Sequence, residues 1–500
     1  MRLNILIGGK AGQGIDKFSS IISSVLSKHG YFTFNYRDYQ SLIRGGHNFN
    51  IISISDRWIA SHSQELDILV ALDKETLEHK KQLKKDGFIL SYEKFADKEL
   101  GINLNIALAG ALIKSLSIEK DNLLAELDEL GDDAKKASEL GYESQEEMIY
   151  LKPLKNKPYL LTGTQGVAQG AKNSNLGLYV AYPMTPATGV MNELSDRLFQ
   201  AENEIAVANI AIGASFAGKL AMAGTSGGGF DLMSETLSLQ GMSEIPLTIY
   251  LASRPGPATG VPTYTSQQDL NTALEAGHGE FPRIVIAPGD PIEAIETTNQ
   301  ALYLAEKFST LSIILSDKHL ASSQYALNKK AEQSLKIPIR KQLPSKDIVK
   351  ATSYEHTPEG LTTEDPKLTE KGMEQRLKKA EDIRKFLKKN FNTYKLHGKK
   401  SKNLVIAWGS TKGAVLDAIQ DLPARFLQVI YLKPFPEQVK KIMEKSDNLI
   451  IIENNSTAQL ASLIKKETGI DIPQKNHILK YDARPFEYDK LKNEIGKRLK

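Results

Sequence analysis

The loop that most constrains this chain is the pentapeptide Y-P-M-T-P at residues 182–186, because of what lies on either side of it. Residues 176–181 form an apolar run that predicts a buried strand. The spacing of apolar residues over 187–200 predicts a helix, with Thr185 as its cap and Pro186 as its first residue. In open α/β sheets ligands collect at such loops, because free backbone N–H groups and the helix dipole point there. A plain connection between a strand and a helix explains the pentapeptide equally well.

Strand and helix patterns alternate over most of the chain and predict an α/β fold with three open-sheet domains. A chain of 500 residues is too long for one hydrophobic core, which supports about three domains of usual size. The predicted divisions are a domain at 1–150, a second at 151–325, a linker with a charged helix at 326–400, and a third domain at 401–500.

The composition is that of an ordinary globular protein, with 41% hydrophobic and 25% charged residues. The net charge of +4 is small for this length, and the Lys-rich stretches lack interleaved aromatic residues, so they predict surface rather than a nucleic-acid groove. No apolar run reaches the roughly 18 residues of a membrane span. The apolar start at 3–7 is too short for a signal peptide, which predicts a cytoplasmic protein that binds no membrane.

Cysteine is absent from the chain. This excludes disulfides, a thiolate nucleophile and an iron–sulfur cluster held by the chain's own cysteines. A redox centre, if the reaction needs one, must therefore belong to a partner.

The amino terminus runs from a strand at 3–7 through a glycine-rich loop at 8–14 into an amphipathic helix at 15–28, an arrangement that favours phosphate binding. The loop spacing, G-x-x-G-x-G, is neither a dinucleotide fingerprint nor a P-loop, which disfavours a nicotinamide-dependent dehydrogenase. An alternative role for this loop is only to pack the helix on the strand. Further on, Arg44 and His47 flank two glycines, a pattern that favours a bulged turn over an anion site.

The second domain carries two further candidate features. The helix predicted at 203–221 is apolar and small on most faces, so it is expected to be buried, with Glu204 near its start. A carboxylate there also favours the helix dipole without any chemistry. The loop at 254–263 contains three prolines, two glycines and Arg254, which describes a stiff loop that presents a guanidinium group or anchors itself by an ion pair.

These motifs, in this order and over nearly the whole chain, resemble the alpha subunit of the 2-oxoacid:ferredoxin (acceptor) oxidoreductases in the form where a gamma domain is fused ahead of the alpha part. The matching segments are G-x-x-G-Q-G at 9–14, L-I-R-G-G-H at 42–47, Y-P-x-T-P at 182–186, N-E-I at 203–205, T-S-G-G-G-F at 225–230, R-P-G-P-x-T-G at 254–260, G-H-G-E-F-P at 277–282 and E-N-N at 453–455.

The resemblance implies a gamma-like domain, a pyrimidine-binding domain and a transketolase C-terminal-like domain. It also implies thiamine diphosphate as catalyst, bound between this chain and a beta subunit that holds the diphosphate, Mg²⁺ and a [4Fe–4S] cluster. No metal ligand is assigned to this chain. The expected reaction is oxidative decarboxylation of a 2-oxoacid, most like 2-oxoglutarate, to acyl-coenzyme A and CO₂, with electrons passed to ferredoxin by a dimer of alpha–beta pairs.

By resemblance, Glu204 hydrogen-bonds the N1′ atom of the cofactor's pyrimidine ring and is the catalytic residue, in a site shared with Tyr182 and Pro183. Arg254 binds the substrate carboxylate, because its planar fork of donors matches two oxygens. Thr185 and Thr263 add hydroxyl contacts to the 2-oxo group.

The resemblance places the phosphates of coenzyme A at Gly12 and Gly14. One departure concerns the first loop of the pyrimidine-binding domain, where many relatives carry G-N-E-A and this chain has G-T-Q-G at 163–166. Gln165 is therefore left out of the site.

Pyruvate or a branched-chain 2-oxoacid stays open as the substrate, and so does an acceptor other than ferredoxin. A non-catalytic assembly or binding homologue is a further alternative. The presence of Glu204, Arg254 and Thr185 together argues against it.

Overall fold

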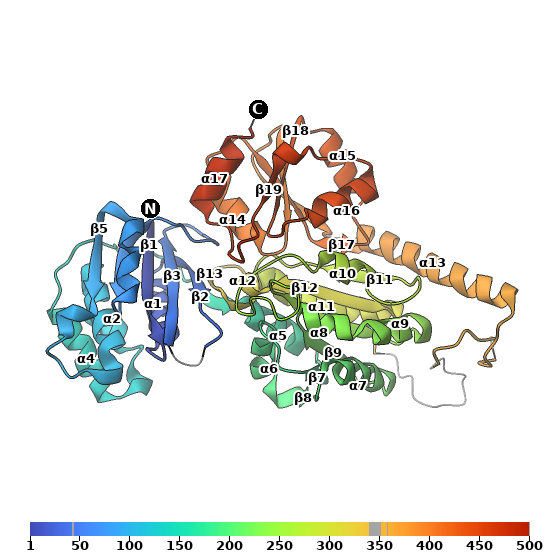
Figure 1. Ribbon diagram of the computed structural model, residues 1–500, viewed down its shortest axis with the longest axis horizontal. Helices are drawn as coiled ribbons and strands as arrows, with labels where there is room; N and C mark the ends of the chain where they lie inside the picture. Colours follow the sequence, from blue (N-terminus) through green and yellow to red (C-terminus); the bar gives the residue numbers. More distant parts are fainter. Residues whose placement is uncertain (43–44, 340–351, 358, 500) are drawn as a thin grey trace. The chain divides into compact units, whose positions relative to one another are not determined.

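The computed structural model describes residues 1–42, 45–339, 352–357 and 359–499, so Arg44 lies outside the described residues. The chain divides into two compact units (Figure 1). The first contains Met1–Thr162, Ser322–Lys329 and Glu487–Leu491, and the second contains Gly163–Ala321, Lys330–Phe486 and Lys492–Lys500. The described residues form three multi-stranded sheets with helices, which confirms the predicted α/β class.

The first unit is built on a seven-stranded sheet in the order β5-β4-β1-β3-β2-β13-β6. Its strands are β1 (Arg2–Ala11), β2 (Phe32–Asp38), β3 (Gly45–Ser55), β4 (Leu66–Ala71), β5 (Leu83–Ser91), β6 (Tyr159–Thr162) and β13 (Gln324–Leu327). Strand β1 pairs antiparallel with β3 and parallel with β4. Helices α1 (Ile15–Lys28), α2 (Leu104–Ser115) and α4 (Asp132–Glu143) supply side chains to one hydrophobic core with this sheet.

The charged residues 120–143 form two helices, α3 (Lys120–Leu124) and α4, separated by residues 125–131. Gly131, directly before α4, has a φ of 84°, in the left-handed region that glycine adopts without strain.

The second unit contains a mainly parallel sheet in the order β17-β11-β12-β10-β9-β7-β8. Its strands are β7 (Leu178–Ala181), β8 (Leu198–Gln200), β9 (Ala221–Thr225), β10 (Leu247–Ser253), β11 (Arg283–Ile286), β12 (Leu311–Asp317) and the antiparallel β17 (Tyr431–Lys433). Because β8 and β9 pair with opposite sides of β7, the order of strands reverses at β7. Such a reversal is where open α/β sheets bind ligands.

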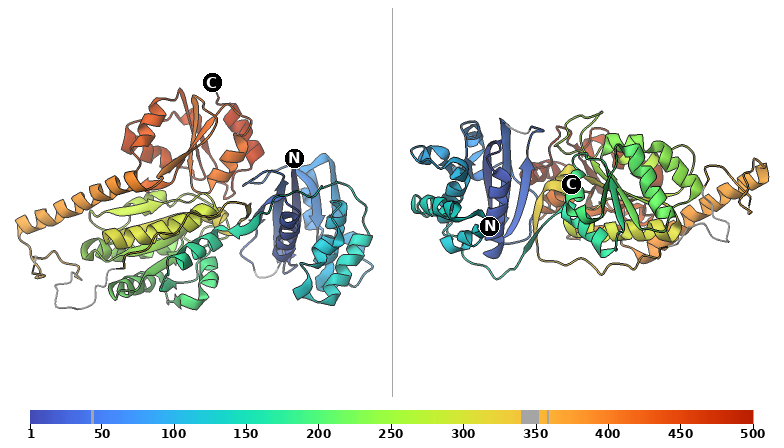
Figure 2. Two further views of the ribbon diagram at one scale, coloured as in Figure 1. Left: turned by 180° about the vertical axis from the view of Figure 1, so that it is seen from behind. Right: turned by 90° about the horizontal axis from the view of Figure 1, so that it is seen from below.

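Helices cover both faces of this sheet (Figure 2). Alternate strand residues face opposite sides, and two hydrophobic cores result. Helices α7 (Glu204–Phe216) and α9 (Ser234–Ser243) contribute to one core, and α5 (Gly163–Asn173) and α11 (Pro291–Phe308) to the other.

The third sheet, also in the second unit, has the order β14-β16-β15-β18-β19. Its strands are β14 (Tyr394–Gly398), β15 (Asn403–Trp408), β16 (Arg425–Val429), β18 (Asn448–Glu453) and β19 (His477–Leu479), with helices α14 (Thr411–Ala418), α15 (Gln438–Glu444) and α16 (Gln459–Thr468). The charged helix expected before it is α13 (Pro366–Asn390), where the Asp365 side chain accepts a hydrogen bond from the backbone N–H of Leu368.

Strand β14 lies within the stretch expected to be a linker, and it joins this sheet through its pairing with β16. The domain divisions drawn from the sequence stay predictions. Among the described residues, no helix combines the length and apolar character needed to cross a bilayer.

Candidate active site

The candidate site lies at one edge of the parallel sheet in the second unit, where three strands end in loops. Ala181 of β7 is in register with Gly224 of β9, and Thr225 of β9 with Leu251 of β10. Because the strands are parallel, the loops after them leave from the same edge. The Y-P-M-T-P loop, the Arg254 loop and residues 226–229 therefore converge there. Residues 226–229, called the glycine turn below, are the cap and first residues of helix α8 (Gly227–Leu232).

The helix predicted over 187–200 is shorter in the structure. Helix α6 covers only Thr188–Glu193, and Leu198–Gln200 form β8, because pairing with β7 outweighs the local helical pattern. The residue that precedes α6 is Ala187, so Thr185 is not the helix cap. Thr185 lies instead in the irregular loop, partly buried, while Tyr182 and Pro183 at the start of the loop are exposed.

Glu204 is the first residue of α7, as expected from the sequence. The helix begins there because the Asn203 side chain accepts a hydrogen bond from the backbone N–H of Ala206 at 2.9 Å. Glu204 is 3% exposed, and its Oε1 has no hydrogen-bond partner among the described residues. A buried polar atom without a partner costs about 1–3 kcal/mol. A ligand that donates a proton here would remove that cost.

Gly229 allows this arrangement by its lack of a side chain. A Cβ atom at Gly229 would lie 2.6 Å from Cγ and 2.7 Å from Oε1 of Glu204. The turn at 226–229 can therefore approach the Glu204 carboxyl group only as glycine.

Arg254 joins two of the loops. Its Nη1 donates a hydrogen bond to the backbone carbonyl of Thr185 at 2.8 Å, and its Nε is buried without a hydrogen-bond partner among the described residues. Burial lowers the pKa of Arg254, and the charges of Asp269 and Glu204 act against this shift. The guanidinium thus lies close enough to both carboxyl groups for their charges to affect its pKa.

Asp269 is a site residue that the sequence did not indicate. Burial raises its pKa to about 6, against a hydrogen bond with Ser253. Its Oδ2 lacks a hydrogen-bond partner among the described residues and would lie 2.6 Å from a Cβ at Gly227. An acid just before a helix, here α10 (Leu270–Glu275), resembles an ordinary cap, and only its burial beside the glycine turn marks it out.

Thr263 is buried in the same loop as Arg254. The structure thus brings Thr185 into contact with Arg254, and Glu204 into contact with the glycine turn. The arrangement provides a half-buried guanidinium for a carboxylate and a buried carboxyl oxygen for a proton donor.

Gly12 and Gly14 belong to the first unit. Both have positive φ, 97° and 70°, and Gly14 precedes α1. The Gln13 side chain closes the loop by accepting from Lys10 N and donating to the carbonyl of Leu72. No atom of the described residues lies within 4 Å of a Cβ built at Gly12, so these residues leave the backbone there open to a ligand.

The glycines beside His47 form an irregular start to β3. Gly45 and Gly46 have φ values of 77° and 66°, and the register with β1 shifts there, in agreement with the predicted bulged turn.

Comparison with known proteins bears on this site directly. Residues 169–392 match the family model described as pyruvate flavodoxin/ferredoxin oxidoreductase, thiamine diP-binding, and residues 4–130 match the one described as pyruvate ferredoxin/flavodoxin oxidoreductase. The fold and the loops therefore define an oxidoreductase chain with a thiamine diphosphate-binding domain.

Individual relatives narrow the class. The 2-oxoacid:ferredoxin oxidoreductase subunit alpha of Sulfolobus sp is 32% identical, over 100% of this chain and 97% of the relative. The 2-oxoglutarate synthase subunit KorA of Archaeoglobus fulgidus is 30% identical over 61% of this chain and 90% of its own length. The chain belongs to the 2-oxoacid:ferredoxin oxidoreductase family, and its full-length relatives are alpha subunits.

A solved structure agrees with this assignment. The 2-oxoglutarate:ferredoxin oxidoreductase from Magnetococcus marinus, with 2-oxoglutarate, coenzyme A and succinyl-CoA bound, superimposes with a TM-score of 0.87 at 25% identity. The match covers 99% of both chains.

Proposed function

We propose that this chain, together with a beta subunit, oxidatively decarboxylates 2-oxoglutarate to succinyl-coenzyme A and CO₂, with ferredoxin as electron acceptor. The observation that carries the proposal is the buried, unpartnered Oε1 of Glu204 beneath the glycine turn at 226–229. An oxygen that lacks a hydrogen-bond donor suits the N1′ atom of the pyrimidine ring of thiamine diphosphate.

Thiamine diphosphate, when bound, supplies a nucleophilic carbon that attacks the 2-oxo group and so permits loss of CO₂. Glu204 holds a proton between its Oε1 and N1′ of the pyrimidine ring. Because Glu204 is buried and its Oε1 has no partner among the described residues, this oxygen is available for that hydrogen bond. Tyr182 and Pro183 line the approach to the ring at the start of the loop after β7.

Arg254 binds the substrate's 1-carboxylate through the guanidinium N–H groups that do not donate to the Thr185 carbonyl. The bond from its Nη1 to the Thr185 carbonyl orients the guanidinium, and its unpartnered Nε supports a role in anion binding. The hydroxyls of Thr185 and Thr263 then contact the 2-oxo oxygen.

In the first unit, Gly12 and Gly14 bind the phosphates of coenzyme A. Two observations support this: the described residues leave open space at Gly12, and both glycines precede a helix. The beta subunit holds the [4Fe–4S] cluster, because this chain has no cysteine to bind it. The resemblance to the family places Mg²⁺ on the beta subunit as well. Two alpha–beta pairs form the complete enzyme.

The choice of 2-oxoglutarate rests on relatives. The Magnetococcus structure contains 2-oxoglutarate, and the Archaeoglobus relative is named for it. The broader name 2-oxoacid of the full-length relatives keeps pyruvate and branched-chain 2-oxoacids as alternative substrates.

The test uses the chain co-expressed anaerobically with its beta-type subunit. Reduction of a low-potential dye is measured with 2-oxoglutarate, pyruvate and a branched-chain 2-oxoacid, each with and without coenzyme A. Glu204→Gln is expected to lower kcat by about 10²-fold or more, the usual range for loss of general acid–base catalysis. Calorimetric titration with thiamine diphosphate and Mg²⁺ should show weaker binding as well.

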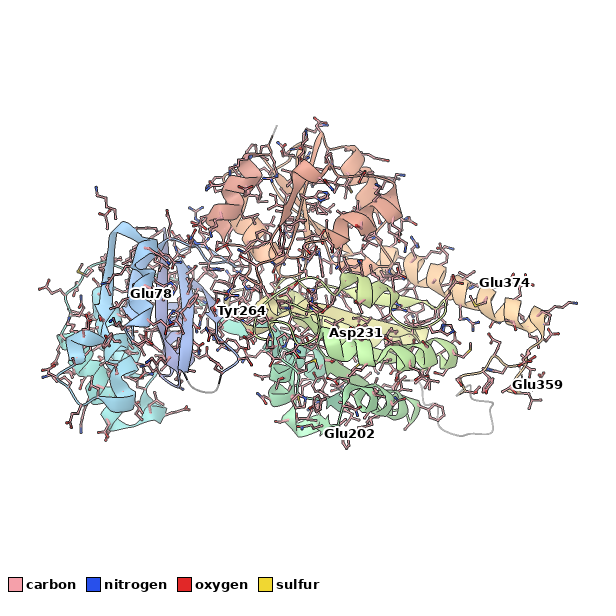
Figure 3. All side chains as sticks on the ribbon, viewed as in Figure 1. Glu78, Glu202, Asp231, Tyr264, Glu359 and Glu374 are labelled. Carbon is pink, nitrogen blue, oxygen red and sulfur yellow. The ribbon has the colours of Figure 1, made fainter. Side chains whose placement is uncertain are left out.

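Glu202→Gln is the matched control, because Glu202 is exposed just before the same helix (Figure 3). It should behave like the wild type. A complex that contains cofactor and cluster but turns over none of the 2-oxoacids would overturn the proposal and favour an assembly role.

A further inference from the structure

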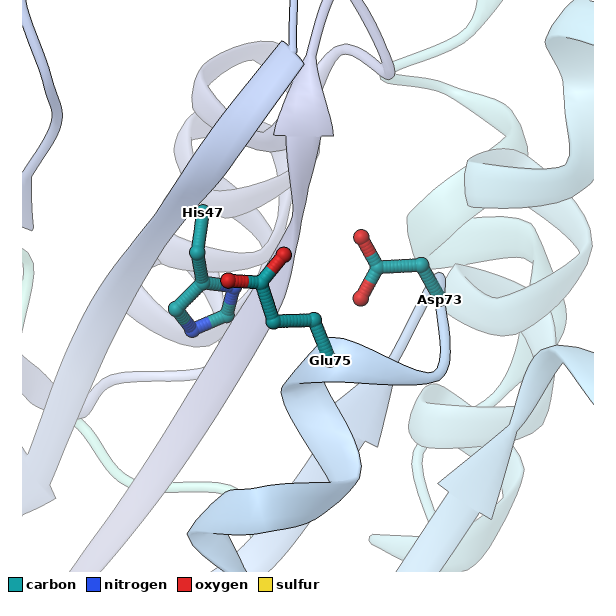
Figure 4. Close-up of side chains that lie close together, drawn as sticks. All are labelled: His47, Asp73 and Glu75. Carbon is teal, nitrogen blue, oxygen red and sulfur yellow. The ribbon is translucent and has the colours of Figure 1, made fainter.

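Three potential metal ligands gather in the first unit, at the edge of its sheet where β1 runs into the glycine loop. His47 lies on β3 opposite Lys10 of β1, and Asp73 and Glu75 follow β4 at the start of the 3-10 helix η1 (Glu75–Gln82). One ring nitrogen of His47 and one carboxylate oxygen from each acid lie within 4.8 Å of one another. Figure 4 shows the three side chains turned toward one another.

Asp73 has one carboxylate oxygen that takes part in the local structure and one that is available to a metal ion. Its Oδ1 accepts hydrogen bonds from the backbone N–H and hydroxyl of Thr76, at 2.9 and 2.8 Å, and so caps the turn into η1. Its Oδ2 has no hydrogen-bond partner among the described residues, although Asp73 is only 8% exposed. A buried carboxylate oxygen in this position favours a cation.

The hydrogen bonds around His47 determine which of its nitrogens is free. Gln82 Oε1 lies 2.9 Å from Nδ1 of His79, and an amide oxygen only accepts, so this nitrogen carries the proton. In the neutral ring, Nε2 of His79 is then an acceptor. It lies 2.8 Å from Nε2 of His47, which must donate to it.

The consequence is that the Nδ1 atom of His47 carries a lone pair. This nitrogen is buried and has no hydrogen-bond partner among the described residues. A metal-binding histidine characteristically donates its other N–H to a second group that sets the tautomer, and His79 supplies that group here.

We propose that His47 Nδ1, Asp73 Oδ2 and the Glu75 carboxylate bind one divalent transition-metal ion of the Zn²⁺ type, with a water molecule as fourth ligand. Zn²⁺ takes both imidazole nitrogens and carboxylate oxygens as ligands, and it also binds in sites where three protein ligands leave a fourth position for water. Ligand atoms about 2.0–2.2 Å from one ion lie no more than about 4.4 Å apart. Glu75 is exposed and can close the remaining gap.

The site shares no residue with the thiamine site, and the proposal does not rest on the proposed function. Gly8 of β1 lies against two residues of this region, His47 and Thr76. Because Gly8 of β1 would place a Cβ 2.6 Å from Cγ2 of Thr76 and 3.3 Å from Cε1 of His47, only glycine lets these three segments meet.

The experiment is a titration of the untagged, full-length chain, first stripped with a chelator, with Zn²⁺ in competition with a chromogenic chelator. One equivalent is expected to bind. Glu75→Gln and His47→Gln should each weaken that binding at least 10-fold, and His79→Phe should weaken it about 10- to 100-fold, the range for loss of the group that orients a ligand. Co²⁺ in place of Zn²⁺ should give a visible absorption band that these variants lose.

Glu78→Gln is the matched control, because Glu78 is an exposed acid on the same 3-10 helix (Figure 3). It should bind as the wild type does. Glu75 is exposed, so its substitution leaves folding intact, which circular dichroism of each variant would verify. Absence of saturable binding, or equal affinity in Glu75→Gln, His47→Gln and the wild type, would refute the site.

Discussion

Two sets of buried carboxyl groups in the second unit differ in how completely the surrounding residues bind their oxygens. Glu293, on α11, is fully enclosed by partners. It pairs with Lys412 at 2.7 Å and Lys395 at 2.9 Å, and accepts from Gln428 Nε2 at 2.6 Å and Gly289 N at 2.8 Å. Glu204 and Asp269, at the loop edge of the parallel sheet, each keep an oxygen without a hydrogen-bond partner among the described residues.

Under the proposed function, this difference distinguishes a structural carboxylate, Glu293, from carboxyl groups that contact a ligand. Burial raises the pKa of Glu293, but the charges of Lys412 and Lys395 outweigh burial, so its pKa lies below the ordinary 4.5. At Asp269 burial dominates instead, and the pKa rises to about 6. Ion pairs within the protein compensate the cost of burying a charge. A buried acid without such a partner keeps that cost, but it can bind a ligand.

The largest expected effect comes from breaking the paired group. Lys412→Met removes the ion-pair partner of Asp290 and one of the two lysines that pair with Glu293. It should lower the free energy of unfolding by about 3–5 kcal/mol, the usual cost of an uncompensated buried charge. Urea titration at pH 7 measures this. The triple variant Lys412→Met with Asp290→Asn and Glu293→Gln should recover most of the loss, and a Lys412→Met protein as stable as the wild type would contradict the comparison.

The unpaired group should respond in the opposite direction. A pKa of about 6 for Asp269, against 3.8 in the unfolded chain, means that the folded state holds a proton which the unfolded state releases between pH 4 and pH 6. Stability contributed by this group therefore falls as pH rises through that window. Asp269→Asn removes the dependence and should stabilise the protein at pH 7 by up to about 3 kcal/mol.

The measurement for Asp269→Asn is urea unfolding at several pH values, with the wild type alongside. The two proteins should be equally stable below about pH 4 and should diverge as pH rises to 6. A constant difference at all pH values would show that the substitution acts through packing rather than through the charge.

The smallest expected effect concerns the glycine turn that lies against Glu204. Gly229→Ala forces its Cβ against Glu204 and should cost about 1–3 kcal/mol of stability by overpacking, together with weaker binding of thiamine diphosphate. Gly228→Ala is the matched control, because a Cβ there has only the Ala258 carbonyl, at 3.8 Å, within reach. If the two variants bind the cofactor equally, the turn does not shape the site.

Much of the fold follows from local patterns. The helix at 15–28 lies where apolar spacing predicts it, because strong periodicity reports which face of an element is buried. The predicted strand at 3–7 is part of β1, which extends to Ala11 through its pairing with β3, so the glycine loop predicted at 8–14 is limited to residues 12–14. The early position of Glu204 in a small, apolar helix likewise predicts its burial. The shortened helix after Y-P-M-T-P was not predictable, because pairing of β8 with β7 depends on a neighbouring strand rather than on the local sequence.

Local sequence thus determined much of the order of strands and helices, and with it the helix start that carries Glu204 and the loop that carries Arg254. Tertiary structure alone decided which residues meet. It brought β13 into the sheet of the first unit and β17 beside β11, left Asp269 buried without a full set of partners, and gathered His47, Asp73 and Glu75. Burial and proximity arise from the packing of segments distant along the chain, and no local pattern records that packing.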